Sequence, residues 1–127
     1  MARHRVFFKA AGFISFFVPG IAIAAQGLSG LTSITDTLQQ DDVYGGCMAR
    51  ISPAPSTITT SSGAALDCSG DRFVTFDCEG KHGSKSGGNA RFNTAVAALI
   101  TDRKVQVLVS DSPKINGFCR VVRIDLK

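Results

Sequence analysis

Four cysteines constrain this chain more than any other feature. They stand at Cys47, Cys68, Cys78 and Cys119 of 127 residues, so successive gaps are 21, 10 and 41 residues. These gaps lack the close C-x2-4-C pairs that are typical of zinc sites. An even number of cysteines in a small exported chain is typical of a disulfide framework. We therefore expect two disulfides and no metal, with all three pairings of four cysteines left open.

The N-terminus has the layout of a secretory signal peptide. Arg3, Arg5 and Lys9 form a basic start, residues 10–18 are apolar, and the small-x-small pattern at 22–24 follows a Pro-Gly pair. This order is typical of a leader that signal peptidase removes. We expect a signal peptide at 1–24, with cleavage after Ala24 or Ala25 and no membrane span afterwards. The protein is then exported, either to the periplasm or to the medium.

Removal of the leader changes the charge of the chain. The whole chain carries 14 Lys and Arg and 10 Asp and Glu, which gives +4. Three of the basic residues and none of the acidic residues lie before residue 24, so the remaining 103 residues carry +1. Nucleic-acid binding requires a surplus of basic residues to neutralise phosphates. We therefore expect no nucleic-acid partner.

The remaining chain is long enough for one domain with a modest core. We divide it into an N-terminal arm or short helix at 25–42 and a single disulfide-stapled, β-rich domain at 43–127. The helix alternative for the first segment rests on apolar residues at roughly helical spacing, Leu28, Leu31, Ile34 and Leu38.

The sequence pattern of the domain predicts mainly β structure with one helix. Strand patterns cover 43–51, 56–61 and 72–78 before the helix, and 104–110 and 118–126 after it. The helix is expected at about 89–103, with Ser86 or Asn89 capping its start. Its predicted apolar face consists of Phe92, Ala95, Val96, Leu99 and Ile100. The fold class is therefore α+β, in the order β-β-β-α-β-β, as a small OB-like barrel or a curled sheet.

Several motifs together resemble those of a group of small exported bacterial proteins of uncharacterised function. They are Asp77-Cys78-Glu79-Gly80, the alanine-rich helix, VQVLVSD from Val105 and NGFCRVVRIDL from Asn116. The resemblance covers roughly Phe73 to Leu126. The element order is also similar to that of the OB-fold B subunits of bacterial toxins, which implies a barrel with a helix between its third and fourth strands. Fold similarity of this kind does not transfer a ligand site.

The loop 79–88 is the main candidate for a ligand site. It joins a strand to a helix and contains Lys81, His82 and Lys85 among glycines and serines. Its spacing fits neither the Walker loop nor the dinucleotide G-x-G-x-x-G pattern, so we expect no nucleotide cofactor. Free N–H groups at a helix start favour anions, which makes the loop a candidate anion or ligand site. The alternative is a solvated connector whose glycines supply turn geometry.

The sequence gives little support for catalysis. One histidine remains after leader removal, and no G-x-S-x-G nucleophile motif occurs. Ser84, His82 and Asp77 crowd one loop, whereas catalytic triads are assembled from separate elements. We interpret Asp77 and Glu79 as solvent-facing, and Arg120 and Arg123 as outward charges on the last strand.

These observations favour an exported, non-enzymatic binding module with a glycan or anion ligand and no cofactor, in a monomer or a homo-oligomer. The alternative is a monomeric periplasmic or secreted protein-interaction factor, such as an inhibitor or an envelope accessory protein.

Overall fold

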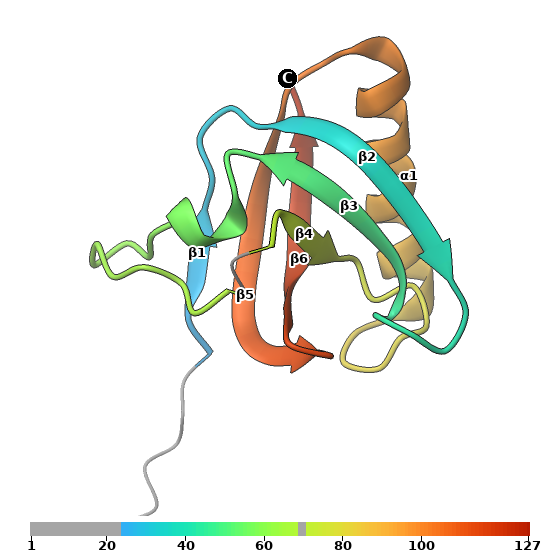
Figure 1. Ribbon diagram of the computed structural model, residues 1–127, viewed down its shortest axis with the longest axis horizontal. Coiled ribbons are helices and arrows are strands. Elements are labelled where there is room, and N and C mark those ends of the chain that lie inside the picture. The colour runs from blue at the N-terminus through green and yellow to red at the C-terminus, as the bar shows by residue number, and fades with distance from the viewer. Residues whose placement is uncertain (1–23, 69–70) are drawn as a thin grey trace, which may run out of the picture.

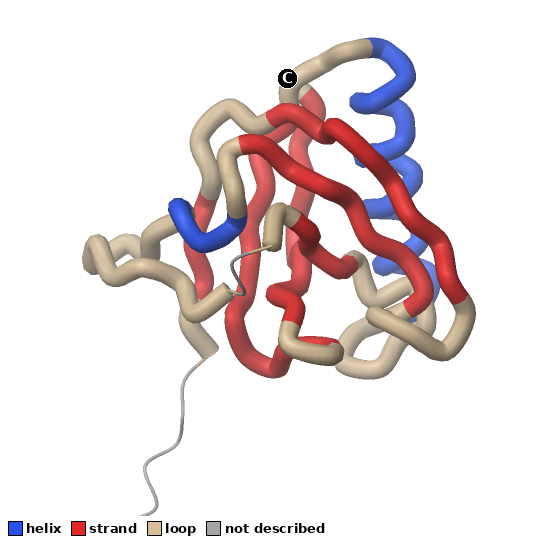
Figure 2. The backbone as a smooth tube through the Cα atoms, viewed as in Figure 1, coloured by secondary structure: helices blue, strands red, loops and turns tan. Residues whose placement is uncertain are grey.

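The computed structural model describes residues 24–68 and 71–127, so the predicted signal peptide lies almost wholly outside the described residues. The elements are β1 (Gln26–Leu28), β2 (Ser33–Gln40), β3 (Gly46–Ser52), η1 (Pro55–Thr57), β4 (Phe73–Thr75), α1 (Lys85–Thr101), β5 (Val105–Ile115) and β6 (Phe118–Leu126). The mainly β, α+β class is confirmed (Figure 2). In the described ranges no helix has the length and hydropathy that a bilayer crossing requires.

The six strands form one sheet in the order β1-β5-β6-β4-β3-β2. All neighbours are antiparallel except β4 and β6, which pair in parallel at Thr75 and Arg120. The two edge strands, β1 and β2, follow one another in the chain, and Thr32 between them forms a bridge with Val105 at the start of β5. The Thr32 amide donates to the Val105 carbonyl and the Val105 amide to the Thr32 carbonyl, both at 2.8 Å.

β1 and β2 therefore act as one long, bent strand that closes the sheet on itself (Figure 1). Counted in this way, the barrel has five strands, with the helix between the third and fourth. This is the OB-like arrangement expected from the element order. The expectation of a short helix at 25–42 is wrong, because this segment forms β1 and β2.

The strand predicted at 56–61 is also wrong. Residues Pro55–Thr57 form the 3-10 turn η1, and Thr59 then forms a single bridge with Ala65 across an exposed tip. Two prolines beside this segment explain the difference, since proline cannot donate to a ladder. The hairpin around this tip projects from the side of the barrel opposite α1 (Figure 1).

The helix α1 closes the side of the barrel that the three-residue β4 leaves short. It packs against β2, β3 and β6 (Figure 1). Phe92, Ala95 and Ala98 enter the core, and the Phe92 ring meets Phe76 edge-on at 5.8 Å between centroids. Ile100, expected on the apolar face, is instead 78% exposed.

Both disulfides hold segments next to β4. Cys47 pairs with Cys78, and Cys68 pairs with Cys119, at Cα–Cα distances of 5.7 and 5.5 Å. Two disulfides were expected, and the fold now selects one of the three pairings that the sequence left open. Cys68 and Cys78 flank β4 in the chain. The disulfides therefore tie the short strand β4 to β6 on one side and to β3 on the other.

Candidate functional site

Three loops meet at one end of the barrel, at the bottom of Figure 1. They are the β2–β3 loop (41–45), the β4–α1 loop (76–84) and the β5–β6 turn (116–117). A Cβ atom added at Gly45 would lie 2.7 Å from Thr75 Oγ1 and 3.3 Å from the Asp77 Cα, which shows how closely the first two loops approach. Loops of OB-type barrels are where this architecture binds oligosaccharides and oligonucleotides.

The β2–β3 loop has an unusual backbone. Asp42, Tyr44, Gly45 and Gly46 all have positive φ, at 59°, 57°, 77° and 86°. A non-glycine residue in this region is strained and persists only where its surroundings hold it. Tyr44 is held on two sides: its carbonyl accepts a 2.6 Å hydrogen bond from a threonine hydroxyl of β4, and its ring packs edge-on against Phe118 at 5.3 Å.

Asp77 determines the path of the β4–α1 loop. Its side chain is 1% exposed, and its two carboxylate oxygens accept the backbone N–H groups of Lys81 at 2.7 Å and His82 at 2.8 Å. The expectation that Asp77 faces solvent is therefore wrong. Both carboxylate oxygens accept backbone N–H groups of the loop and so hold its conformation. The hydrogen bond from His82 comes from its main chain and not from its imidazole.

Two arginines lie close to this buried carboxylate. Arg120, whose side chain is 12% exposed, places Nη1 4.0 Å from Asp77 Oδ2 and donates from Nε to the Pro113 carbonyl at 2.9 Å. Arg120 therefore turns inward, contrary to its predicted outward orientation, whereas Arg123 is exposed and pairs with Asp125 as a surface charge.

Arg91, on α1, is the second of these arginines. Burial, followed by the nearby Arg120 guanidinium, lowers the pKa of Arg91, and Asp77 partly offsets this by raising it. Its Nε atom is buried and has no hydrogen-bond partner within the described residues. No sequence pattern indicates this cluster, because its members come from β6, α1 and the β4–α1 loop.

The first turn of α1 lies directly on the main chain of the loop. Ser84 caps the helix by accepting the Gly87 amide at 3.1 Å, so the helix begins earlier than predicted, and neither Ser86 nor Asn89 is the cap. A Cβ atom at Gly88 would lie 2.3 Å from the Asp77 carbonyl oxygen. Glycine at this position is therefore what allows the helix to approach the loop.

A cleft of about 430 Å³ opens beside this helix start. Its walls come from the end of β2, the start of β3, the β4–α1 loop and the first turns of α1. Most of its lining side chains carry hydrogen-bonding groups: Gln39, Gln40, Asp41, Glu79, Lys85 and Asn89. The Asn89 amide donates to the Cys78 and Lys85 carbonyls, whereas no side-chain hydrogen bond of Gln39 or Gln40 occurs in the described part of the chain.

The structure separates the three residues of the predicted ligand loop. Lys85 lines the cleft. Lys81 lies 3.4 Å from the Glu79 carboxylate and is thereby partly neutralised. His82 is exposed and contributes its backbone N–H to Asp77. Only Lys85 of the three is therefore placed to meet a ligand in the cleft.

A second hollow, of about 240 Å³, lies at the bend between β1 and β2 and faces η1. Leu28 and Leu31 line it and are 45% and 67% exposed. Pro53 and Ile58 line its other side, so more apolar side chains line this hollow than line the cleft.

Few groups suited to catalysis come together in the described ranges. All four cysteines are in disulfides, so none is a free thiol. No group of three or more His, Cys, Asp or Glu side chains is placed to hold a metal ion there. Comparisons with protein-family models, with curated proteins and with solved structures found no match.

Proposed function

We propose that this protein is an exported, non-enzymatic binding module that holds a hydroxyl-rich glycan in the cleft between β2 and the start of α1. The observation that carries the proposal is the lining of that cleft. Its volume of about 430 Å³ is suited to a small ligand. Amides and carboxylates supply both the donors and the acceptors that sugar hydroxyls require.

The charges of the cleft favour a neutral glycan over a simple anion. Asp41 and Glu79 contribute two negative charges to the lining, and Lys85 contributes one positive charge. Lys81 lies outside the lining but pairs with Glu79 at 3.4 Å, so the acidic and basic charges at the cleft balance. A free sulfate or phosphate would therefore meet no surplus of positive charge, whereas neutral hydroxyl groups require none. This narrows the glycan-or-anion expectation to glycans, with Lys85 as the residue that contacts any acidic substituent.

Two features support export. The basic, apolar and small-x-small order of the first 24 residues is typical of a cleaved leader. Two disulfides are typical of proteins that fold in an oxidising compartment. Both features agree with a periplasmic or secreted location.

A glycan screen followed by titration calorimetry tests the proposal. We expect the double variant Gln39→Ala/Gln40→Ala to weaken binding about tenfold, because each lost hydrogen bond contributes about 0.5–1.5 kcal/mol. Gln26→Ala, an exposed glutamine on β1, is the matched control and should bind normally. Equal affinities for the double variant and the control would place the ligand elsewhere.

Lys85→Ala separates neutral from acidic glycans. For a neutral ligand we expect a modest loss of affinity that does not change with salt. For an acidic ligand the loss should be larger and should diminish as salt screens the charge. Lys127→Ala, which removes an exposed lysine outside the cleft, controls for the change in net charge.

The second candidate, a protein-interaction factor, is favoured by the exposed Leu28 and Leu31 that line the second hollow. This function predicts a complex with another exported protein that Leu31→Asp disrupts. The Gln39→Ala/Gln40→Ala variant should leave that complex intact, so the two candidates give opposite results with the same pair of variants.

A further inference from the structure

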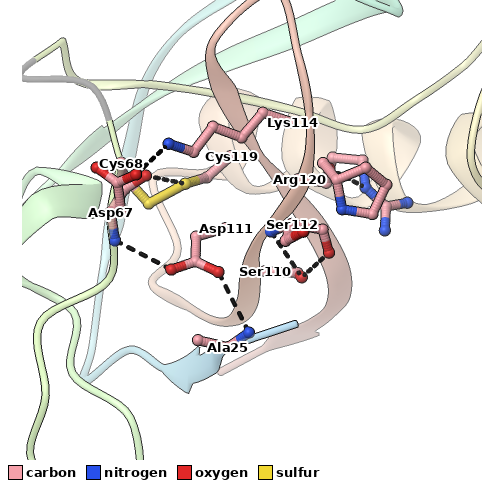
Figure 3. Close-up of a disulfide and its surroundings, with 10 residues drawn as sticks. Ala25, Asp67, Cys68, Ser110, Asp111, Ser112, Lys114, Cys119 and Arg120 are labelled. Atoms are coloured by element: carbon pink, nitrogen blue, oxygen red, sulfur yellow. Dashed lines mark hydrogen bonds and ion pairs between the residues drawn. A yellow bond between two sulfur atoms is a disulfide. The ribbon is translucent and has the colours of Figure 1, made fainter. Parts of the chain in front are cut away.

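One carboxylate, that of Asp111 on β5, holds the first described residues of the chain (Figure 3). Its Oδ1 accepts the backbone N–H of Ala25 at 3.2 Å, and its own N–H donates to the Ala25 carbonyl at 3.1 Å. Its Oδ2 accepts the N–H of Asp67, next to the Cys68–Cys119 disulfide, at 3.1 Å. Asp111 thus joins the start of β1 to the disulfide-bonded loop.

No cation pairs with this carboxylate in the described part of the chain. The basic side chain drawn near it in Figure 3 is Lys114, whose Nζ lies 2.7 Å from the Asp67 carboxylate instead. Asp111 is only partly exposed, so its negative charge is incompletely solvated. On the N-terminal side, the group that donates to the Asp111 carboxylate is the backbone N–H of Ala25.

We propose that signal peptidase cleaves the Ala24–Ala25 bond and that the new α-ammonium group of Ala25 forms an ion pair with Asp111. In the hydrolysis, the oxygen of water joins the Ala24 carbonyl carbon, the C–N bond breaks, and the Ala25 nitrogen takes up protons to become an ammonium group. The donor that now contacts Oδ1 as a neutral amide would then carry a positive charge at the same place. This inference rests on the export part of the proposed function and is independent of the ligand.

The geometry distinguishes the two cleavage positions that the sequence leaves open. Cleavage after Ala24 places Ala22 and Ala24 at the small-x-small positions, whereas cleavage after Ala25 places the bulkier Ile23 at the first of them. Cleavage after Ala25 would also remove the residue that Asp111 holds by its N–H and its carbonyl. The structure therefore assigns Ala25 as the first residue of the mature chain.

N-terminal sequencing and intact mass of the protein exported by a bacterial host, without reductant, test the cleavage position. We expect the sequence Ala-Gln-Gly-Leu from Ala25. A chain that begins at Gln26 or later overturns this inference and leaves the export proposal standing. A chain that retains the leader overturns both.

Selective acetylation of the α-amino group tests the ion pair. We expect acetylation to raise the unfolding equilibrium constant of the mature protein about tenfold, because a charge-assisted hydrogen bond becomes a neutral one. The same modification should have little effect in Asp111→Asn and its full effect in Asp71→Asn, an exposed control. Equal effects in the wild type and in Asp111→Asn would overturn the ion pair.

A second measurement avoids dependence on the folding of Asp111→Asn. In the wild type we expect the α-amino group to react with the acetylating reagent several times more slowly in the folded protein than in urea, since the paired ammonium group is held protonated. Equal rates in the two states would contradict the pairing.

Discussion

At the scale of single residues, Asp77 organises the candidate binding end through both its side chain and its main chain. Its carboxylate accepts the Lys81 and His82 amides, and its carbonyl accepts the Gly80 amide at 3.1 Å. The same carboxylate lies 4.0 Å from the Arg120 guanidinium. One buried side chain therefore fixes the loop and compensates a neighbouring cation.

We expect Asp77→Asn to destabilise the protein by about 1.5–3 kcal/mol, because the amide NH2 group that replaces one carboxylate oxygen cannot accept a backbone N–H. Urea unfolding monitored by circular dichroism measures the change. The matched control is Asp125→Asn, which removes a surface charge paired with Arg123 and should cost at most about 1 kcal/mol. Equal losses in the two variants would show that the Asp77 bonds contribute no more than a surface pair.

Residue patterns predicted the two disulfides but not the role of Asp77. Cysteine number and spacing alone favour disulfides over a zinc site, so this prediction requires no knowledge of the fold. The burial of Asp77 depends on the approach of α1 and of Arg120, which is far away in the sequence. A strand-end Asp-Cys-Glu sequence does not indicate those contacts, so the pattern alone predicts a solvent-facing Asp77.

At the scale of elements, the start of α1 depends on two glycines with different requirements. A Cβ atom at Gly88 would lie 2.3 Å from the Asp77 carbonyl oxygen, which is shorter than the contacts that real Cβ atoms make. At Gly83 the nearest atoms, on Asp77 and Arg120, would be 3.6 and 3.9 Å away, which is ordinary contact distance. Neither residue has positive φ, so the comparison isolates the steric effect.

We expect Gly88→Ala to destabilise the protein by about 1–3 kcal/mol, because the helix must move away from the loop. Gly83→Ala should be close to neutral. Thermal unfolding of the two variants measures the difference, and equal melting temperatures would mean that α1 shifts at little cost. If the cleft is the ligand site, Gly88→Ala should also weaken binding, since the helix that moves carries Lys85.

The elements themselves were predicted unevenly. The helix could be located from its apolar face, and the valines of β5 lie in the core. The error at 25–42 arose because three of its four leucine and isoleucine residues are exposed and only Ile34 is buried. Their helix-like spacing did not reflect burial. The conformation of this segment is instead set by backbone pairing with β5 and β3, which local sequence does not encode.

At the scale of the whole molecule, the disulfides reinforce a barrel with a small core. The bonded residues are separated by 31 positions in Cys47–Cys78 and by 51 in Cys68–Cys119. We expect replacement of either pair by alanine to lower the free energy of unfolding by about 2–5 kcal/mol, because the unfolded chain regains the freedom of a long loop. Denaturant unfolding of each double variant measures this loss, and unchanged midpoints would contradict it.

Native mass spectrometry of the exported protein tests the assembled state. We expect a subunit mass that lacks four thiol hydrogens, as two disulfides require. A closed ring would support the predicted resemblance to toxin B subunits. A monomer would instead favour the protein-interaction candidate and direct attention to Leu28 and Leu31.

The hairpin around the Thr59–Ala65 bridge offers a way to handle the protein in experiments. Residues 61–65 at its tip are exposed, and a Cβ atom at Gly63 would have no neighbour within 4 Å. Exposed tips of small residues are the places where chains accept insertions. An affinity tag inserted here would anchor the molecule to a sensor chip by the side opposite α1 (Figure 1), so that every immobilised copy presents the cleft to the sample.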